Sequence, residues 1–260
     1  MLSYEQALIE TAARLETSGS DTPKLDALLL LCEAVEKDKI HIYAHPKTVL
    51  TQEQYARFDV FVTRREKAEP MAYILGRKGF WDIDLDVCKD VLIPRPDTET
   101  LIEAILTLYP NKDQNLRFLE LGVGSGAVIL SLLGVYAQAQ AWATDMSDAA
   151  LKCASGNAVK LQLNTRLKLL KSNWFNAIEP TQRFDVILSN PPYIPSADIP
   201  NLMRDVGLYE PHQALDGGML GLDAYHKIIN KAPHYLNKNG LLVLEVGCDQ
   251  AEDVMEIMVR

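Results

Sequence analysis

Beyond residue 115 the sequence alternates between short apolar runs and stretches with helical spacing. Runs rich in Val, Ile and Leu indicate buried strands, which we expect at residues 116–121, 139–144, 167–170, 184–189 and 241–246. Apolar side chains three and four positions apart indicate helices at residues 128–136, 148–163, 223–235 and 250–258. Strands that alternate with helices are typical of a parallel sheet covered on both faces. The sequence therefore predicts an α/β fold for this part of the chain.

The first 75 residues show helical spacing and no strand pattern. Ser3 is placed to cap a first helix that ends near Gly19, and a second helix begins after Pro23. Residues Thr51–Gln54 fit a capping box that opens a third helix. Nothing in this region has catalytic spacing. A small helical bundle that recognises a partner is one interpretation, a purely structural cap is the other, and this stretch alone leaves both open.

Between these two parts the apolar period changes to two. In residues 76–93 the apolar side chains of Trp81, Ile83, Leu85 and Val87 alternate with aspartates, the pattern of a strand with one wet face. We predict a β-hairpin here that joins two domains. The expected organisation is a helical substrate-recognition domain at 1–75, a hairpin linker at 76–95 and a domain at 96–260 that carries the parallel sheet.

The charge and the cysteine content limit the kinds of partner that this protein is expected to have. The 260 residues include 26 Lys and Arg against 35 Asp and Glu, a net charge of −9, whereas phosphate-backbone binding relies on clustered cations. The four cysteines form no Cys-x-x-Cys pair, so neither a zinc site nor a disulfide framework is expected. No apolar run approaches a membrane span, and the N-terminus lacks a basic-then-apolar signal. We expect a cytoplasmic protein without a metal, a membrane partner or a direct nucleic-acid partner.

A glycine-rich loop, Glu120–Gly126, follows the first strand of the predicted sheet. Its spacing is Gly-x-Gly-x-Gly and so differs from the Gly-x-Gly-x-x-Gly of dinucleotide-binding loops. Glycines let a backbone turn tightly and come close to a ligand, here an adenosyl and amino-acid moiety. Asp145 ends the second strand, where a carboxylate accepts hydrogen bonds from ribose hydroxyls. The predicted cofactor contacts in the loop are Gly122, Val123, Gly124, Ser125 and Gly126.

Asn173 and Trp174 follow the third predicted strand. A loop at this place is expected to face adenine, with Asn173 at its polar edge and the Trp174 ring on its face. The alternative for Trp174, a ring that covers the core at an interface, is equally compatible with the sequence.

Residues Ser189–Tyr193 form a Ser-Asn-Pro-Pro-Tyr turn at the end of the fourth strand. Two prolines fix φ and carry no N–H, so the turn presents carbonyl oxygens and one carboxamide. Such a turn suits a planar –NH2 group: Asn190 and the Pro191 carbonyl each accept one hydrogen, and Tyr193 supplies a flat wall. The alternative is an ordinary loop start, since Asn and Pro are common turn residues.

An adenosyl pocket beside a turn that grips an amine or amide indicates methyl transfer from S-adenosylmethionine to a planar nitrogen. The residues resemble those of the HemK-type family of protein-(glutamine-N5) methyltransferases, which modify peptide chain release factors. The resemblance covers nearly the whole chain. Asn-Pro-Pro-Tyr alone is also similar to DNA-adenine and ribosomal-RNA methyltransferases. Further segments make the resemblance specific to the glutamine methyltransferases: Pro70–Gly76, Ile93–Glu99, Asn173–Phe175, Tyr209–Pro211 and Asp216–Leu222.

This resemblance implies a Rossmann-like class I S-adenosylmethionine-dependent methyltransferase domain at 96–260. It implies that Gly122–Gly126, Asp145, Trp174 and Asn190 contact S-adenosylmethionine. The glutamine of a Gly-Gly-Gln motif in the release factor would then be held by Asn190, Pro191, Pro192 and Tyr193. Asn173 stands where relatives often carry Asp, so a weaker adenine contact is expected there. Relatives continue past the last helix into a final antiparallel strand pair, whereas this sequence stops at Arg260 before such a pair. Loss of that pair would expose a sheet edge.

Two other functions remain as alternatives. A nucleic-acid methyltransferase acting on N6 of adenine or N2 of guanine would use the same turn on an exocyclic amine, with Tyr193 stacked on a flipped base. The net charge of −9 counts against it. A non-catalytic module that binds the cofactor or a partner is the second, and an intact Asn190–Tyr193 turn counts against that. We expect the protein to act as a monomer.

Overall fold

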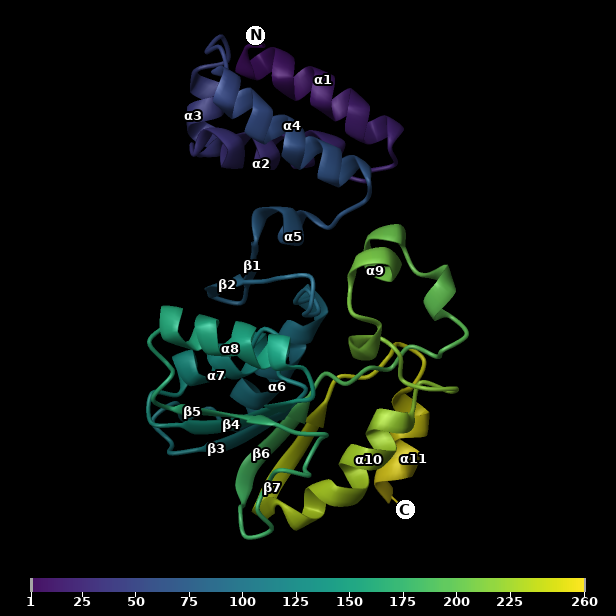
Figure 1. The fold of residues 1–260 in the computed structure, drawn as a ribbon. Coiled ribbons are helices and arrows are strands. Elements are labelled where there is room, and N and C mark those ends of the chain that lie inside the picture. The colour runs from purple at the N-terminus through teal and green to yellow at the C-terminus, as the bar shows by residue number, and fades with distance from the viewer. Residues whose placement is uncertain (1, 260) are drawn as a thin grey trace. The chain divides into compact units, whose positions relative to one another are not determined.

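A computed structural model describes residues 2–259 of the chain, which divide into two compact units (Figure 1). The first unit runs to Gly76 and also includes Met203–Tyr209. The second comprises Arg77–Leu202 and the residues from Glu210 onward. Each unit has its own hydrophobic core.

The first unit is helical. The predicted helices at its N-terminus are confirmed, and both capping interactions are present. The Ser3 hydroxyl accepts from the backbone N–H of Gln6, whose side chain in turn accepts from the N–H of Ser3, and Thr51 and Gln54 pair in the same way. The helices of this unit are α1 (Tyr4–Thr17), α2 (Pro23–Val35), α3 (Lys39–Ala44), α4 (Gln52–Glu66), α5 (Met71–Leu75) and α9 (Arg204–Tyr209).

The second unit begins with an antiparallel hairpin of β1 (Arg77–Phe80) and β2 (Ile83–Asp86), as predicted. One detail of the prediction is wrong, because Trp81 lies in the turn and not on a strand. Its φ of 51° is in the left-handed region, and its backbone N–H donates to the Glu99 carboxylate at 2.9 Å. The alternation holds only from Ile83 on, where Leu85 is fully buried.

Five parallel strands form the main sheet, and the predicted α/β fold is confirmed. The strand order is β5-β4-β3-β6-β7. The chain therefore proceeds outward from the middle in one direction, then returns and proceeds outward in the other. The direction reverses between β3 and β6. The strands are β3 (Arg117–Leu121), β4 (Gln140–Asp145), β5 (Leu167–Lys171), β6 (Phe184–Ser189) and β7 (Leu236–Leu244).

Helices cover both faces of this sheet (Figure 1). Successive residues of β3 show the two layers: Phe118 packs with α6 (Glu99–Leu108), α7 (Ala127–Val135) and α8 (Asp148–Lys160), whereas Leu119 packs with α10 (Asp223–Lys231). The last helix, α11 (Ala251–Val259), packs on α10 through Val254 and Ile257. The helix predicted at 223–235 ends earlier than expected, because α10 stops at Lys231. A 3-10 turn, Ala232–His234, follows α10.

Two negative observations apply to residues 2–259. None of their helices combines the length and apolar character needed to cross a membrane. Nor do three or more His, Cys, Asp or Glu side chains gather there in a way that would hold a metal ion.

Among the described strands, β7 lies at one edge of the main sheet and β5 at the other.

Candidate active site

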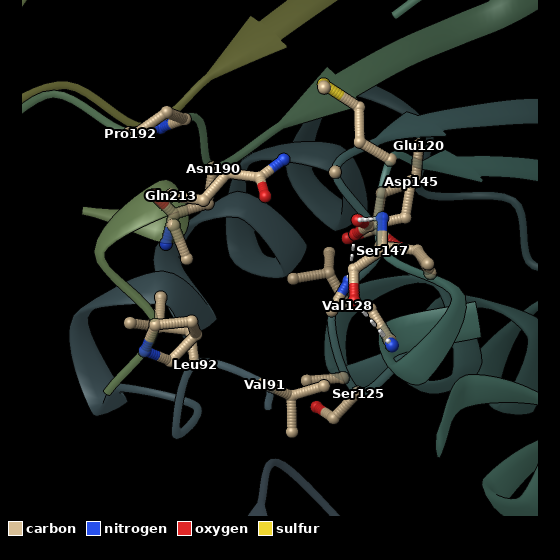
Figure 2. Close-up of a pocket in the computed structure, with 18 of the residues that line it drawn as sticks. Val91, Leu92, Glu120, Ser125, Val128, Asp145, Ser147, Asn190, Pro192 and Gln213 are labelled. Atoms are coloured by element: carbon tan, nitrogen blue, oxygen red, sulfur yellow. Dashed lines mark hydrogen bonds between the residues drawn. The ribbon is translucent and has the colours of Figure 1, made fainter. Parts of the chain in front are cut away.

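A cavity of about 470 Å3 opens at the carboxyl ends of the parallel strands, beside the boundary between β3 and β6. Ligands of open α/β sheets bind at such a reversal of strand order, and small-molecule sites span roughly 300–1,000 Å3. Figure 2 shows Asn190, Pro192 and Gln213 on one side of the hollow, with Glu120, Asp145 and Ser147 on the other. The location and the size both suit a small organic ligand.

The glycine loop between β3 and α7 forms one wall of this cavity. Gly122, Gly124 and Gly126 have φ angles of 79°, 52° and 84°, a region that other residues rarely adopt. The backbone N–H groups of Gly122 and Val123 donate to the Thr144 carbonyl at 2.8 and 3.0 Å, which holds the loop against β4. Among the described residues that line the cavity are Gly122, Val123, Gly124 and Ser125, whereas Gly126 is the N-cap of α7 and is not one of them.

Asp145 is fixed at the cavity wall by backbone groups on both sides. Its Oδ2 accepts a hydrogen bond from the Gly124 N–H at 3.0 Å, and its Oδ1 accepts one from the Ser147 N–H at 2.9 Å. Each carboxylate oxygen can accept a second hydrogen bond. The orientation of Asp145 is therefore set by the fold, and both oxygens keep a free lone pair for a ligand hydroxyl. Its role at the ribose remains a prediction.

Glu120 also lines the cavity, although the sequence analysis named it only as the first residue of the glycine-rich loop and predicted no ligand contact for it. The residue is 3% exposed, and its carboxylate accepts a hydrogen bond from the Ile129 N–H at 3.3 Å. Burial raises the pKa of Glu120 well above its ordinary value, and the nearby charge of Asp145 raises it further. The available signal was an acidic residue inside an apolar strand directly before a glycine loop.

Asn173 and Trp174 both line the cavity from the loop after β5. Trp174 has a φ of 53°, a costly conformation for a residue with a side chain, so the surrounding structure must hold it in place. The Trp174 ring also packs against the core on the α10 face of the sheet. Trp174 therefore both lines the cavity and covers the core, and its contact with adenine remains a prediction.

The turn after β6 brings Asn190 to the cavity. The Ser189 hydroxyl donates to the Leu121 carbonyl at 2.6 Å and so ties the start of the turn to the start of the glycine loop. Asn190 Nδ2 donates to the hydroxyl of Thr98 at 3.0 Å. The carboxamide nitrogen is thus engaged by the protein, and Oδ1 is the atom left to accept from a ligand. Asn190 lies across the hollow from Asp145 (Figure 2).

The rest of the turn packs against glycines from a distant segment. A Cβ on Gly217 would lie 2.7 Å from the Pro192 carbonyl oxygen and 2.8 Å from Tyr193 Cα, so only glycine fits there. Gln250 Nε2 donates to the Tyr193 carbonyl at 2.9 Å. Of the described residues that line the cavity, Pro192 belongs to this turn beside Asn190, whereas Pro191 is buried and Tyr193 packs against Tyr225 and its neighbours. The substrate roles of Pro191 and Tyr193 remain predictions.

One wall of the cavity is held by an ion pair between two segments far apart in the chain. The Arg95 guanidinium contacts the Glu210 carboxylate, whose side chain is 1% exposed, and Glu210 Oε2 also accepts from the Ile93 N–H at 3.1 Å. Neighbours of both residues, Pro94 and Pro211, line the cavity, as does Arg95 itself. Two of the segments on which the family resemblance rests are therefore joined in one wall.

These residues fit S-adenosylmethionine. Its ribose hydroxyls are donors that suit the free lone pairs of Asp145, and its positive charges suit the acidic side chains that line the cavity, among them Glu120 and Asp145. The bare backbone of the glycine loop allows close approach. A flat adenine suits the Trp174 ring. The proposed ligand contacts agree with the chemistry of the donors and acceptors present.

Two protein families match the sequence. Residues 6–76 match the PrmC N-terminal domain, and residues 97–205 match the methyltransferase small domain. The fold is similar to the solved structure of a T. Thermophilus 16S rRNA N2 G1207 methyltransferase in complex with AdoMet and guanosine. That similarity has a TM-score of 0.51 at 18% identity and covers 69% of this chain and 44% of that chain. It supports the class I methyltransferase fold.

Similarity to curated proteins extends over almost the entire sequence. The release factor glutamine methyltransferase of Coxiella burnetii is 42% identical over 258 residues, which cover 99% of this chain and 91% of that protein. The release factor glutamine methyltransferase of Caulobacter vibrioides is 40% identical over 253 residues, which cover 97% and 87%. At this identity and coverage, the chain belongs to the release factor glutamine methyltransferase family.

Proposed function

We infer that this chain transfers the methyl group of S-adenosylmethionine to the side-chain nitrogen N5 of a glutamine. The acceptor is the glutamine in the Gly-Gly-Gln motif of peptide chain release factors. Support comes from the full-length similarity to release factor glutamine methyltransferases. The observation in the site that carries the inference is the Asn190 carboxamide, because its nitrogen is engaged by Thr98 and its oxygen is left to accept.

An amide nitrogen is a poor nucleophile because its lone pair is shared with the carbonyl group. When bound, S-adenosylmethionine supplies an electrophilic methyl group on a positively charged sulfur. We propose that Asn190 Oδ1 and the Pro191 carbonyl each accept one hydrogen of the glutamine –NH2 group. Two acceptors make this nitrogen more electron-rich and fix its orientation toward the cofactor side of the cavity. Asn190 is thus expected to act on the reacting nitrogen itself.

Most of the rate acceleration is expected to come from orientation and fixed dipoles. The turn is rigid, since two prolines, the Ser189 bond to Leu121 and the Gln250 bond to Tyr193 restrict its backbone. The Pro192 ring and Tyr193 are proposed to exclude water from the acceptor side. No side chain needs to form a covalent intermediate in this scheme.

Incubation with labelled S-adenosylmethionine and purified release factor tests the function. We expect one added methyl group on the Gly-Gly-Gln peptide, located by mass analysis, and none on a release factor whose motif glutamine is replaced by alanine. Parallel reactions contain ribosomal RNA and DNA. Label on nucleic acid alone would favour the exocyclic-amine alternative, and cofactor binding without any methylated product would favour a non-catalytic module.

We propose that residues 1–75 recognise the release factor, in keeping with their match to the PrmC N-terminal domain. Three apolar side chains of this unit, Ile9, Leu25 and Tyr43, are exposed and line a common hollow. An exposed apolar site of this kind is typical of protein interfaces. An Ile9→Ser variant should raise the KM for release factor and leave the cofactor Kd unchanged. An unchanged KM would assign this hollow no part in recognition.

A further inference from the structure

Gln213 is a polar residue of the cavity to which the proposed function gives no role. It lines the cavity from the 3-10 turn His212–Ala214, and it is exposed. Figure 2 shows Gln213 on the same side of the hollow as Asn190 and Pro192, across from Asp145. It therefore lies on the side where the acceptor, and not the methyl donor, is proposed to bind.

The backbone that carries Gln213 is fixed on both sides. Three residues earlier, the buried Glu210 carboxylate is held in its ion pair with Arg95. Two residues later, the carbonyl of the buried Leu215 accepts a hydrogen bond from the Ile194 N–H at 3.0 Å. Ile194 directly follows the Asn-Pro-Pro-Tyr turn, so this bond attaches the segment of Gln213 to the chain that leaves the proposed acceptor grip.

The carboxamide of Gln213, in contrast to its backbone, is uncommitted. Neither its oxygen nor its nitrogen forms a hydrogen bond with the part of the chain that the structure describes. Other polar side chains that line the cavity are engaged, since Arg95 pairs with Glu210 and Thr98 accepts from Asn190 Nδ2 at 3.0 Å. Gln213 thus keeps both an –NH2 donor and a carbonyl acceptor for a ligand.

The proposed acceptor has few groups left for such a side chain. Both hydrogens of its –NH2 group are assigned to Asn190 Oδ1 and the Pro191 carbonyl. A donor at its side-chain carbonyl would favour the resonance that withdraws the nitrogen lone pair, and would so oppose methyl transfer. The main-chain amides remain. Because the two residues before the glutamine are glycines, which lack side chains and are the most flexible residues, main-chain hydrogen bonds are the available way to fix them.

We propose that Gln213 is a substrate-binding residue whose carboxamide pairs with a main-chain peptide group next to the methylated glutamine. A carboxamide and a peptide group each carry an N–H donor and a carbonyl acceptor, so hydrogen bonds can form in both directions. The inference rests on the proposed function, because it assumes a Gly-Gly-Gln acceptor. These bonds are the same before and during methyl transfer, so they contribute to acceptor binding and not to kcat.

Steady-state kinetics with purified release factor test the proposal. Gln213→Ala and Gln213→Met should each raise the KM for release factor by about fivefold, which corresponds to the loss of a hydrogen bond. Methionine keeps the approximate length of glutamine, so this variant separates lost hydrogen bonds from lost volume. In both variants kcat should stay within about twofold of wild type, and the Kd of S-adenosylmethionine from calorimetry should be unchanged. Gln138→Ala, which replaces an exposed glutamine on the loop before β4, is the control for all three constants.

Three results would overturn this assignment while the wild type still methylates release factor. A wild-type KM in Gln213→Met would show that the carboxamide contributes nothing to acceptor binding. A kcat that rises in both variants would place Gln213 on the side-chain carbonyl of the acceptor, and a raised cofactor Kd would place it at the methyl donor. If the wild type does not methylate release factor at all, the proposed function fails and this inference fails with it.

Discussion

Arg95 and Glu210 lie 115 positions apart in the sequence and form an ion pair in one wall of the cavity. The Glu210 side chain is 1% exposed, whereas that of Arg95 is 35% exposed. Glu210 also binds the Ile93 N–H, so one carboxylate fixes both the side chain and the backbone of the 93–95 segment. The shape of that wall thus depends on a single acidic residue.

Replacing Glu210 by Gln should destabilise the second unit. The amide keeps an acceptor for the Ile93 N–H but leaves Arg95 without its counter-charge. We expect the free energy of unfolding in urea to fall by about 2 kcal/mol, less than the roughly 3–5 kcal/mol of a fully buried pair, because solvent screens Arg95. Lys171→Gln, which breaks an exposed pair with Asp148, is the control and should have no measurable effect. Equal stability of both variants would contradict the assigned importance of the wall.

Asn190→Ala should abolish methylation while binding of S-adenosylmethionine falls less. Loss of one preorganised polar group at a reacting centre lowers kcat on the order of 100-fold or more. Turnover of release factor and the cofactor Kd from calorimetry measure the two effects separately. Asn111→Ala, an exposed asparagine on a loop, is the control. Full turnover in Asn190→Ala would refute its role.

Asp145→Asn should weaken cofactor binding. The carboxylate receives two backbone hydrogen bonds, from Gly124 and Ser147, and an amide has one oxygen with which to accept them. Loss of a charged acceptor and a turned side chain should raise the cofactor Kd by about tenfold or more in calorimetry. Asp148→Asn changes an exposed neighbour and should leave the Kd within about twofold. A matching Kd in wild type and Asp145→Asn would remove Asp145 from the site.

Gly126 and Gly134 offer a matched pair of alanine substitutions at the two ends of α7. At Gly126 the φ is +84° and a Cβ would lie 2.9 Å from Leu130 Cδ1, so Gly126→Ala should destabilise by about 1–2 kcal/mol or more. At Gly134 a Cβ meets nothing within 4 Å, so Gly134→Ala in the helix should stabilise by about 0.5–1 kcal/mol. Urea unfolding measures both. The same sign of change at both positions would contradict the geometry of the loop.

Glu120→Gln should flatten the pH dependence of stability. The pKa of Glu120 is higher in the folded protein than its ordinary 4.5, so the folded state binds more protons in the interval between the two values. The free energy of unfolding therefore falls as the pH rises through this interval, and the variant lacks this contribution. We expect the stability of Glu120→Gln relative to wild type to increase as the pH rises above 4.5. Parallel pH profiles would show that Glu120 is not perturbed.

Local patterns predicted the elements well. The capping box at Thr51–Gln54 and the five apolar runs predicted a helix and five strands that the structure contains. Contiguous motifs also predicted residues that gather at one cavity, from the glycine loop to Asn190. Trp81 was misplaced because alternation continues through a two-residue turn, whose left-handed φ leaves no trace in hydrophobicity.

The supporting partners of the site were not predictable in the same way. Thr98 and Asn190 are 92 positions apart, and Arg95 and Glu210 are 115 apart, so no periodicity or motif links them. Glu245 directly follows β7, and only the pairing of β6 with β7 brings its backbone N–H to the Ser189 carbonyl. Such contacts depend on sheet order, which is a property of the whole fold.

The reversal of strand order between β3 and β6 separates the proposed site for the methyl donor from the proposed site for the acceptor. Most residues proposed to hold the methyl donor follow β3, β4 or β5, whereas the proposed acceptor grip follows β6. Mutations in the loop after β6 can therefore change which acceptor is methylated while the donor stays bound. A scaffold arranged in this way is well suited to diversify into methyltransferases for unrelated nitrogen compounds.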